Sequence, residues 1–173
     1  MKAEAILVHL GLGSNLGDRK KFLNMACNQL RSETINEFRA SSIYESEPLF
    51  KMPQPKYFNM VVCGLTVLPP PEMLKKCQQI EISLGRIRRE RWGSREIDID
   101  ILSYGSIIID NDDLVIPHPE IENRSFVLMP MLELSPEWLH PETGITIKVL
   151  WENWLQKHEE QETLPVNISD KSS

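Results

Sequence analysis

One short segment of the chain has a side-chain pattern that fits only one kind of backbone. Residues 96–101 read Glu-Ile-Asp-Ile-Asp-Ile, so acidic and β-branched side chains alternate. Successive residues of a strand point to opposite faces of a sheet, so this alternation predicts a strand. Its isoleucines would face a core, and Asp98 and Asp100 would share the other face. Aspartate is disfavoured in strands, so this pair favours a functional site over the alternative, a half-solvated edge strand.

The order of the other predicted elements indicates a mixed α and β domain. Apolar periodicity, glycine turns and prolines divide the chain into strand, helix, strand, strand, helix and strand, at residues 5–12, 22–30, 34–45, 57–68, 69–85 and 97–104. This order is typical of ferredoxin-like folds. We therefore expect an α+β fold with a ferredoxin-like βαββαβ core. A hairpin at residues 106–116 and C-terminal helices at 123–134 and 147–158 would be added to it.

Length and composition fit one domain with a short tail. The chain has 173 residues, of which 41% are hydrophobic, which is enough for one sizeable core. Residues 159–173 are polar and show no periodicity. We therefore expect a domain over residues 1–158 followed by a flexible tail over 159–173.

Net charge and cysteine content limit the partners and the compartment. The formal charge of −6 argues against binding to nucleic acid or to an anionic membrane surface. No apolar run approaches the ~20 residues of a membrane helix. Cys27, Cys63 and Cys77 are odd in number and lack paired spacing, so we expect free thiols. These features favour a cytoplasmic protein with neither a membrane nor a nucleic acid as partner.

A strongly basic segment precedes the two aspartates. Residues 86–95 contain five arginines, one glutamate and no lysine, which gives a local charge of +4 in an acidic protein. The guanidinium fork suits bidentate contacts to phosphate oxygens, although a solvated charge run is the simpler alternative. Carboxylates beside arginines describe a site for a Mg²⁺-complexed polyphosphate, in which Asp98 and Asp100 hold the metal.

The remaining motifs are less specific. The glycines of residues 11–17 have neither the Rossmann nor the P-loop spacing, and a tight strand-to-helix turn explains them better. Gln78 and Glu81 share a helix face that, taken alone, is better explained as polar and solvent-exposed. His118 lies in a stiff Pro-His-Pro turn that could equally be ordinary surface. Trp92 lies among arginines and beside a glycine, and a residue in such a loop could belong to a mobile lid.

Four ordered stretches carry a more specific signal: LGLGSNLGD, SSIYESEP with QPKYFNMV, RRERWGSREIDIDIL, and IPHPEIENRSFVLMPMLELSP. The third contains Arg-x-Gly-x-Arg-x-x-Asp-hydrophobic-Asp. Over about residues 5–150 the chain resembles the 6-hydroxymethyl-7,8-dihydropterin pyrophosphokinase family of folate biosynthesis. The resemblance implies an enzyme that transfers diphosphate from ATP to the hydroxymethyl group of the reduced pterin, releases AMP and uses two Mg²⁺ ions. It also implies a monomer that can associate with the next enzyme of the pathway.

The same resemblance assigns roles to individual residues. Metal binding falls to Asp98 and Asp100, and catalysis to this pair with Arg86 and Arg95. ATP would be bound by Gln78, Glu81, Arg86, Arg88, Arg91, Trp92, Arg95, Ile101, His118 and Arg124. The pterin would be bound by Ser46, Leu49, Tyr57, Asn59, Trp92 and Phe126. Taken singly, Tyr57, Asn59 and Phe126 would more often be packing residues.

Two positions depart from the family pattern, and two other functions are open. Phe50 stands where glycine is common, and Ser94 stands where proline is frequent, so the pterin loop and the arginine loop are expected to differ locally.

Another metal-dependent phosphoryl or nucleotidyl transferase could use the same Asp-x-Asp strand. A non-catalytic ferredoxin-like nucleic-acid binder is a further alternative, which the acidic charge and the lack of an RRM-type aromatic motif oppose.

Overall fold

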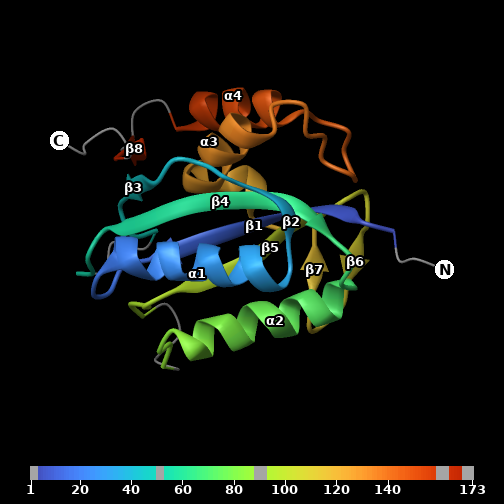
Figure 1. The fold of residues 1–173 in the computed structure, drawn as a ribbon. Helices are drawn as coiled ribbons and strands as arrows, with labels where there is room; N and C mark the ends of the chain where they lie inside the picture. The colour runs from blue at the N-terminus through green and yellow to red at the C-terminus, as the bar shows by residue number, and fades with distance from the viewer. Residues whose placement is uncertain (1–3, 50–52, 88–92, 159–163, 169–173) are drawn as a thin grey trace.

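The protein is built on one antiparallel sheet. The computed structural model describes residues 4–49, 53–87, 93–158 and 164–168. The sheet has strand order β5-β1-β4-β3-β8, and β2 also pairs with β4 (Figure 1). Its strands are β1 (Ile6–Ser14), β2 (Asn36–Ala40), β3 (Tyr44–Ser46), β4 (Tyr57–Thr66), β5 (Asp98–Tyr104) and β8 (Val166–Asn167). Every pairing in it is antiparallel.

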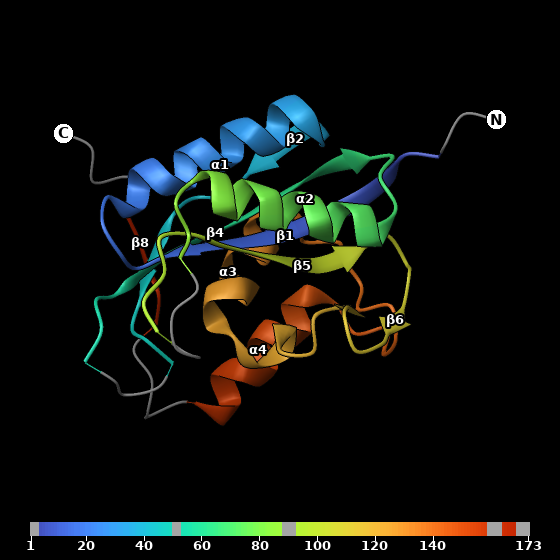
Figure 2. The ribbon, with the colours of Figure 1, turned by 90° about the horizontal axis from the view of Figure 1, so that it is seen from below.

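Helices cover the sheet on both faces, which gives three layers (Figures 1 and 2). One face carries α1 (Arg19–Glu33) and α2 (Pro70–Ser83), and the other carries α3 (Ser125–Leu134) and α4 (Ile147–Lys157). The short helix η1 (Ile121–Asn123) precedes α3, and β6 (Ile109–Asp110) pairs with β7 (Val115–Ile116) in a separate hairpin. None of the helices in the described parts of the chain has the length and apolar content needed to cross a membrane.

Two apolar clusters hold the layers together. The cluster under α1 and α2 contains Ile99 and Ile101, and the one under α3 and α4 contains Leu102 and Trp154. Leu102 lies on the opposite face from Ile101 because successive strand residues alternate, and Tyr104 returns to the face of Ile101 because the pairing of β1 with β5 shifts register between His9 and Leu10. The cysteines are unpaired and buried, as the sequence predicts.

The observed elements confirm most of the predicted ones, with two differences. The expected strand over residues 34–45 is divided into β2 and β3, and the β2–β4 register shifts between Asn36 and Arg39. Residues 166–167 form β8, although no element is expected after residue 158. A two-residue strand gives no periodic signal, and its formation depends on an edge that the rest of the chain supplies. The hairpin and both C-terminal helices are present.

A buried polar row crosses the α3–α4 face of the sheet. His9 of β1 is 1% exposed; its Nδ1 hydrogen-bonds Ser103 Oγ of β5 and its Nε2 hydrogen-bonds Ser135 Oγ after α3, both at 2.8 Å. Burial, aided by the positive charge of Arg39, lowers the pKa of His9 to about 4. The folded chain keeps this imidazole neutral well below the pKa that His9 has in the unfolded chain. Acid should therefore destabilise the folded protein through His9.

We expect His9 to make the free energy of unfolding decrease as the pH falls from 6.5 to about 4. In that window the unfolded chain binds more protons at His9 than the folded chain, so the free energy of unfolding falls as the pH falls, by about 3 kcal/mol in total. Urea unfolding at pH 7 and pH 5 should show His9→Gln losing about 2 kcal/mol less than the unaltered chain. Equal pH dependence in the two proteins would contradict a buried, neutral His9.

Candidate active site

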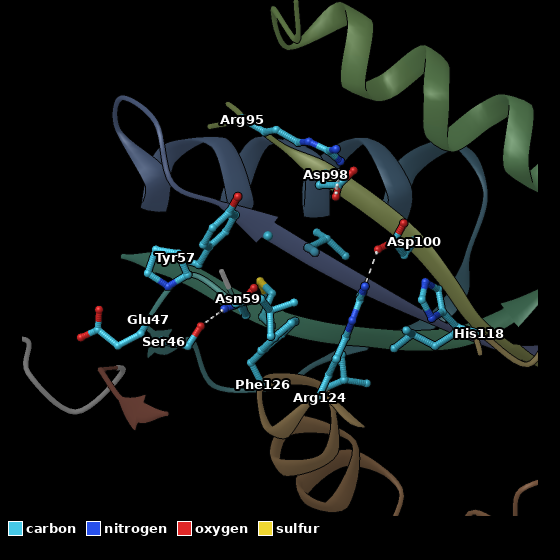
Figure 3. Close-up of a pocket in the computed structure, with 18 of the residues that line it drawn as sticks. Ser46, Glu47, Tyr57, Asn59, Arg95, Asp98, Asp100, His118, Arg124 and Phe126 are labelled. Atoms are coloured by element: carbon cyan, nitrogen blue, oxygen red, sulfur yellow. Dashed lines mark hydrogen bonds and ion pairs between the residues drawn. The ribbon is translucent and has the colours of Figure 1, made fainter. Parts of the chain in front are cut away.

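One pocket lies between the sheet and the start of α3. Its walls come from the ends of β1, β4 and β5, the loop after β3, and the loop that leads into α3 (Figure 3). It gathers ten of the residues that the sequence singles out: Ser46, Leu49, Tyr57, Asn59, Arg95, Asp98, Asp100, His118, Arg124 and Phe126. Residues far apart in sequence therefore form a single cavity, with acidic and basic groups at one end and aromatic and amide groups at the other.

The charged end is organised around the two aspartates of β5. Both side chains lie on the pocket face of the strand, as the alternation predicts (Figure 3). Asp98 Oδ1 lies 3.0 Å from Arg86 Nη1, and Asp98 Oδ2 accepts a hydrogen bond from Arg95 Nη1 at 2.9 Å. Asp100 Oδ2 is 3.9 Å from Arg124 Nη1. Asp98 is therefore well neutralised, whereas Asp100 is held more loosely.

The surroundings of Asp100 disfavour its ionised form. Desolvation in the pocket, followed by repulsion from Asp98, raises the pKa of Asp100 to about 6, although the nearby arginines act in the opposite direction. The described residues contain no group of three or more His, Cys, Asp or Glu side chains that could hold a metal by themselves. Two carboxylates on one face nevertheless fit Mg²⁺, because this ion is commonly held by one or two carboxylates together with phosphate oxygens and water.

Glu81 and Arg86 stabilise β5, the strand that contains the two aspartates. Glu81 of α2 is 5% exposed, accepts a hydrogen bond from the backbone N–H of Ile99 at 2.7 Å, and pairs with Arg86. Burial, partly opposed by the Ile99 hydrogen bond, raises the pKa of Glu81 to about 7. Glu81 therefore contacts the protein itself rather than the pocket, and it fixes the strand between the two aspartates.

Some sequence-predicted nucleotide residues lie elsewhere. Gln78 is exposed on α2, and Ile101 is buried in the core beneath α1 and α2, so neither lines the pocket. Arg88, Arg91 and Trp92, which the sequence assigns to the ATP site, lie outside the described residues, as does Phe50.

His118 and Arg124 complete the charged end. The backbone N–H of His118 donates to the carbonyl of Leu102 at 2.9 Å, which fixes the loop against β5. Its Nδ1 accepts a hydrogen bond from the N–H of Glu120 at 3.1 Å, so the neutral ring carries its proton on Nε2. Burial, with the charge of Arg124 as the next cause, lowers the pKa of His118 to about 4. At neutral pH this histidine is a hydrogen-bond donor without charge.

The other end of the pocket is suited to a flat polar ring. Tyr57 of β4 and Phe126 of α3 lie on either side of Asn59 (Figure 3). Asn59 Nδ2 donates to Ser46 Oγ at 2.7 Å, and both side chains are buried. A Cβ at Gly13 would lie 3.0 Å from Asn59 Oδ1, so glycine leaves room for the amide at this point of β1.

Sequence reasoning missed Asn15. This residue is 1% exposed, and it connects three loops that border the pocket. Its Oδ1 accepts from the N–H of Arg95 at 2.8 Å, its own N–H donates to the carbonyl of Arg95 at 3.1 Å, and its Nδ2 donates to Gln54 Oε1 at 3.2 Å. The only sequence signal is its place within the glycine turn of residues 11–17, which by itself indicates a turn residue.

Comparison with known proteins identifies the family. Residues 9–136 match the family model described as 7,8-dihydro-6-hydroxymethylpterin-pyrophosphokinase (HPPK). The chain belongs to the HPPK family. It is 41% identical over 134 residues to the 2-amino-4-hydroxy-6-hydroxymethyldihydropteridine pyrophosphokinase of Aquifex aeolicus, covering 78% of this chain and 83% of that protein. The protein of the same name from Haemophilus influenzae is 37% identical, with 84% and 91% covered.

Other HPPK relatives are longer. The folic acid synthesis protein fol1 of Pneumocystis carinii is 39% identical over 95% of this chain, which spans only 22% of that protein. A solved HPPK-DHPS in complex with substrates has a TM-score of 0.72 at 15% identity, covering 91% of this chain and 45% of that one. A Plasmodium falciparum HPPK-DHPS gives 0.72 at 16% identity, with 95% and 46% covered. These solved chains share the fold with our HPPK chain over less than half of their own length.

Proposed function

We propose that the chain transfers diphosphate from ATP to the hydroxymethyl group of 6-hydroxymethyl-7,8-dihydropterin, giving AMP and the pterin diphosphate in folate biosynthesis. Family membership supports the pyrophosphokinase activity. The observation that carries the proposal is the composition of the pocket: a pair of carboxylates framed by arginines adjoins a pair of aromatic rings flanking a fixed amide. A polyphosphate and a flat heterocycle would therefore meet in one cavity.

Asp98 and Asp100 would hold Mg²⁺, two ions according to the family resemblance. The bound metal neutralises phosphate charge and favours the ionised form of the attacking hydroxyl. The protein's own contribution is to hold both carboxylates in place before any ligand arrives, through Arg86 and Arg95 on Asp98 and through Glu81 on the intervening backbone.

The basic groups would bind and orient the triphosphate. Arg95 and Arg124 point into the pocket, and Arg86 lies beside Asp98, so guanidinium forks surround the place where negative charge would develop (Figure 3). A neutral His118 would donate from Nε2 to a phosphate oxygen. In-line attack on the β-phosphorus brings two oxygen-rich partners together, so positioning and charge neutralisation supply most of the catalysis.

The aromatic end would recognise the pterin. Tyr57 and Phe126 offer ring faces for stacking, and Asn59 offers an amide that Ser46 holds in one orientation. Leaving a polar edge of the heterocycle unpaired would cost about 1–3 kcal/mol per group, which favours substrates that match this amide. Leu49 lines the same end and is exposed.

The proposal also covers the fold class, the location and the partners. Crossovers from β1 through α1 and from β4 through α2, each skipping one strand, support a ferredoxin-like classification of the core. Buried, unpaired cysteines support a reducing, cytoplasmic location, and the acidic surface opposes nucleic acid as a partner. We propose a monomer that associates with another folate-pathway enzyme, as the joined HPPK-DHPS chains suggest.

A product assay tests the reaction. Incubation of the full chain with ATP, Mg²⁺ and the reduced pterin alcohol should yield AMP and pterin diphosphate in equal amounts. The two products can be separated by anion-exchange chromatography, and omission of the pterin serves as the control. Formation of ADP or free pyrophosphate would instead support a different phosphoryl or nucleotidyl transferase.

A further inference from the structure

The far edge of the main sheet is completed by residues near the end of the chain. Strand β8 runs antiparallel to β3, with Asn167 opposite Tyr44 and Val166 opposite Glu45 (Figure 1). The backbone N–H of Ile168 donates to the carbonyl of Ile43 at 2.9 Å. The side chain of Ile168 also packs against the core cluster under α1 and α2. Backbone pairing and apolar contact therefore both fasten this segment to the sheet.

Strand β3 is a weak element without this neighbour. It is three residues long, and its other partner is β4, through the pairs Tyr44 with Asn59 and Ser46 with Tyr57. Loss of β8 would expose the outer backbone groups of β3 to water and make it an edge strand. Short edge strands fray readily, because local opening disrupts few hydrogen bonds.

The end of β3 reaches the aromatic part of the pocket. Ser46 is the last residue of the strand, and its Oγ accepts the hydrogen bond that orients the amide of Asn59. Tyr44 is tied separately, because its hydroxyl donates to Glu133 Oε2 of α3 at 2.7 Å. Fraying of β3 would therefore act most strongly on Ser46, which lines the pocket.

We propose that β8 is a substrate-positioning strand, which holds β3 in the sheet so that Ser46 and Asn59 present a fixed hydrogen-bonding edge to the pterin. This inference rests on the proposed function, since the pterin is the ligand concerned. The charged end of the pocket is built on β5, at the opposite edge of the sheet, and is braced by α2. The effect of β8 is therefore selective for the pterin over ATP.

Substitutions of Ile168 in the full chain test the attachment of β8 to β3. Ile168→Pro removes the N–H that donates to Ile43. The matched control, Ile168→Val, keeps that donor and most of the apolar contact. Binding of the pterin and of ATP with Mg²⁺ is measured by equilibrium titration, steady-state kinetics give KM for each substrate, and hydrogen exchange reports on the amides of residues 44–46.

The expected result is a rise of about tenfold in Kd and KM for the pterin in Ile168→Pro, as for the loss of one oriented hydrogen bond. ATP binding and kcat should stay within about twofold, β3 amides should exchange faster, and Ile168→Val should behave like the unaltered chain. Unchanged pterin affinity, or an equal loss of pterin and ATP binding, would overturn the inference. If the unaltered chain bound no pterin, the proposed function would fail first, and the inference with it.

Discussion

Replacing Asp98 or Asp100 with alanine is expected to lower kcat by at least about 100-fold, because each change removes a proposed metal ligand from the reacting state. The direction of the change in ATP binding distinguishes between two roles for these carboxylates. Each change also deletes a negative charge beside Arg86, Arg95 or Arg124, which by itself would help the pocket to bind a phosphate. A large fall in kcat with unimpaired binding of metal-free ATP would therefore identify a role in catalysis rather than in simple attraction.

Asp112→Ala is the matched control, because Asp112 is exposed in the turn between β6 and β7, away from the pocket. Initial rates over a Mg²⁺ titration, with nucleotide binding measured separately, would distinguish the three variants. Near-normal rates in both pocket variants would contradict the assignment of this carboxylate pair to the metal.

Replacing Arg95 with alanine is expected to lower kcat/KM by about 10²–10³-fold, the usual effect of losing one preorganised donor to a developing charge. Arg95 lines the pocket, its Nη1 contacts Asp98, and its backbone is held on both sides by Asn15. The guanidinium is thus fixed before the substrate binds. The loss should be larger for Arg95→Ala than for Arg95→Lys, which keeps the charge but not the planar fork.

Arg31→Ala serves as the comparison, because Arg31 lies at the exposed end of α1 and stacks on Phe38, away from the pocket. Rates for the variants are compared at saturating Mg²⁺ after circular dichroism has confirmed equal folding. A change of less than about threefold in Arg95→Ala would remove this arginine from the proposed phosphate site.

Local pattern was sufficient to predict the strand that carries the chemistry. Alternation places Asp98 and Asp100 on one face whatever the rest of the chain does, because the period of a strand is two. The same rule fails three residues after Ile101: Tyr104 packs in the same cluster as Ile101, because the register shifts beside His9. Such a shift depends on the neighbouring strand, so the sequence of β5 alone contains no sign of it.

The sequence is least informative for polar residues whose side chains bond to other parts of the protein. Glu81, which the resemblance assigns to the ATP site, bonds through its carboxylate to Ile99 and Arg86. Asn15 stands in a segment whose glycines predict only a turn, although its side chain joins three loops of the pocket. Whether a polar side chain faces a ligand or another loop is decided by which segments the fold brings next to it.

By itself, the sequence determined the kinds of element, their order, the shared face of the two aspartates and the local excess of arginine. These depend on periodicities and composition over a few residues. Only the tertiary structure decided that Ser46, Asn59 and Phe126 share one pocket with Asp98, and that residues 166–167 extend the sheet. Those facts depend on strand order and on backbone groups left unpaired at an edge, which no local pattern of side chains encodes.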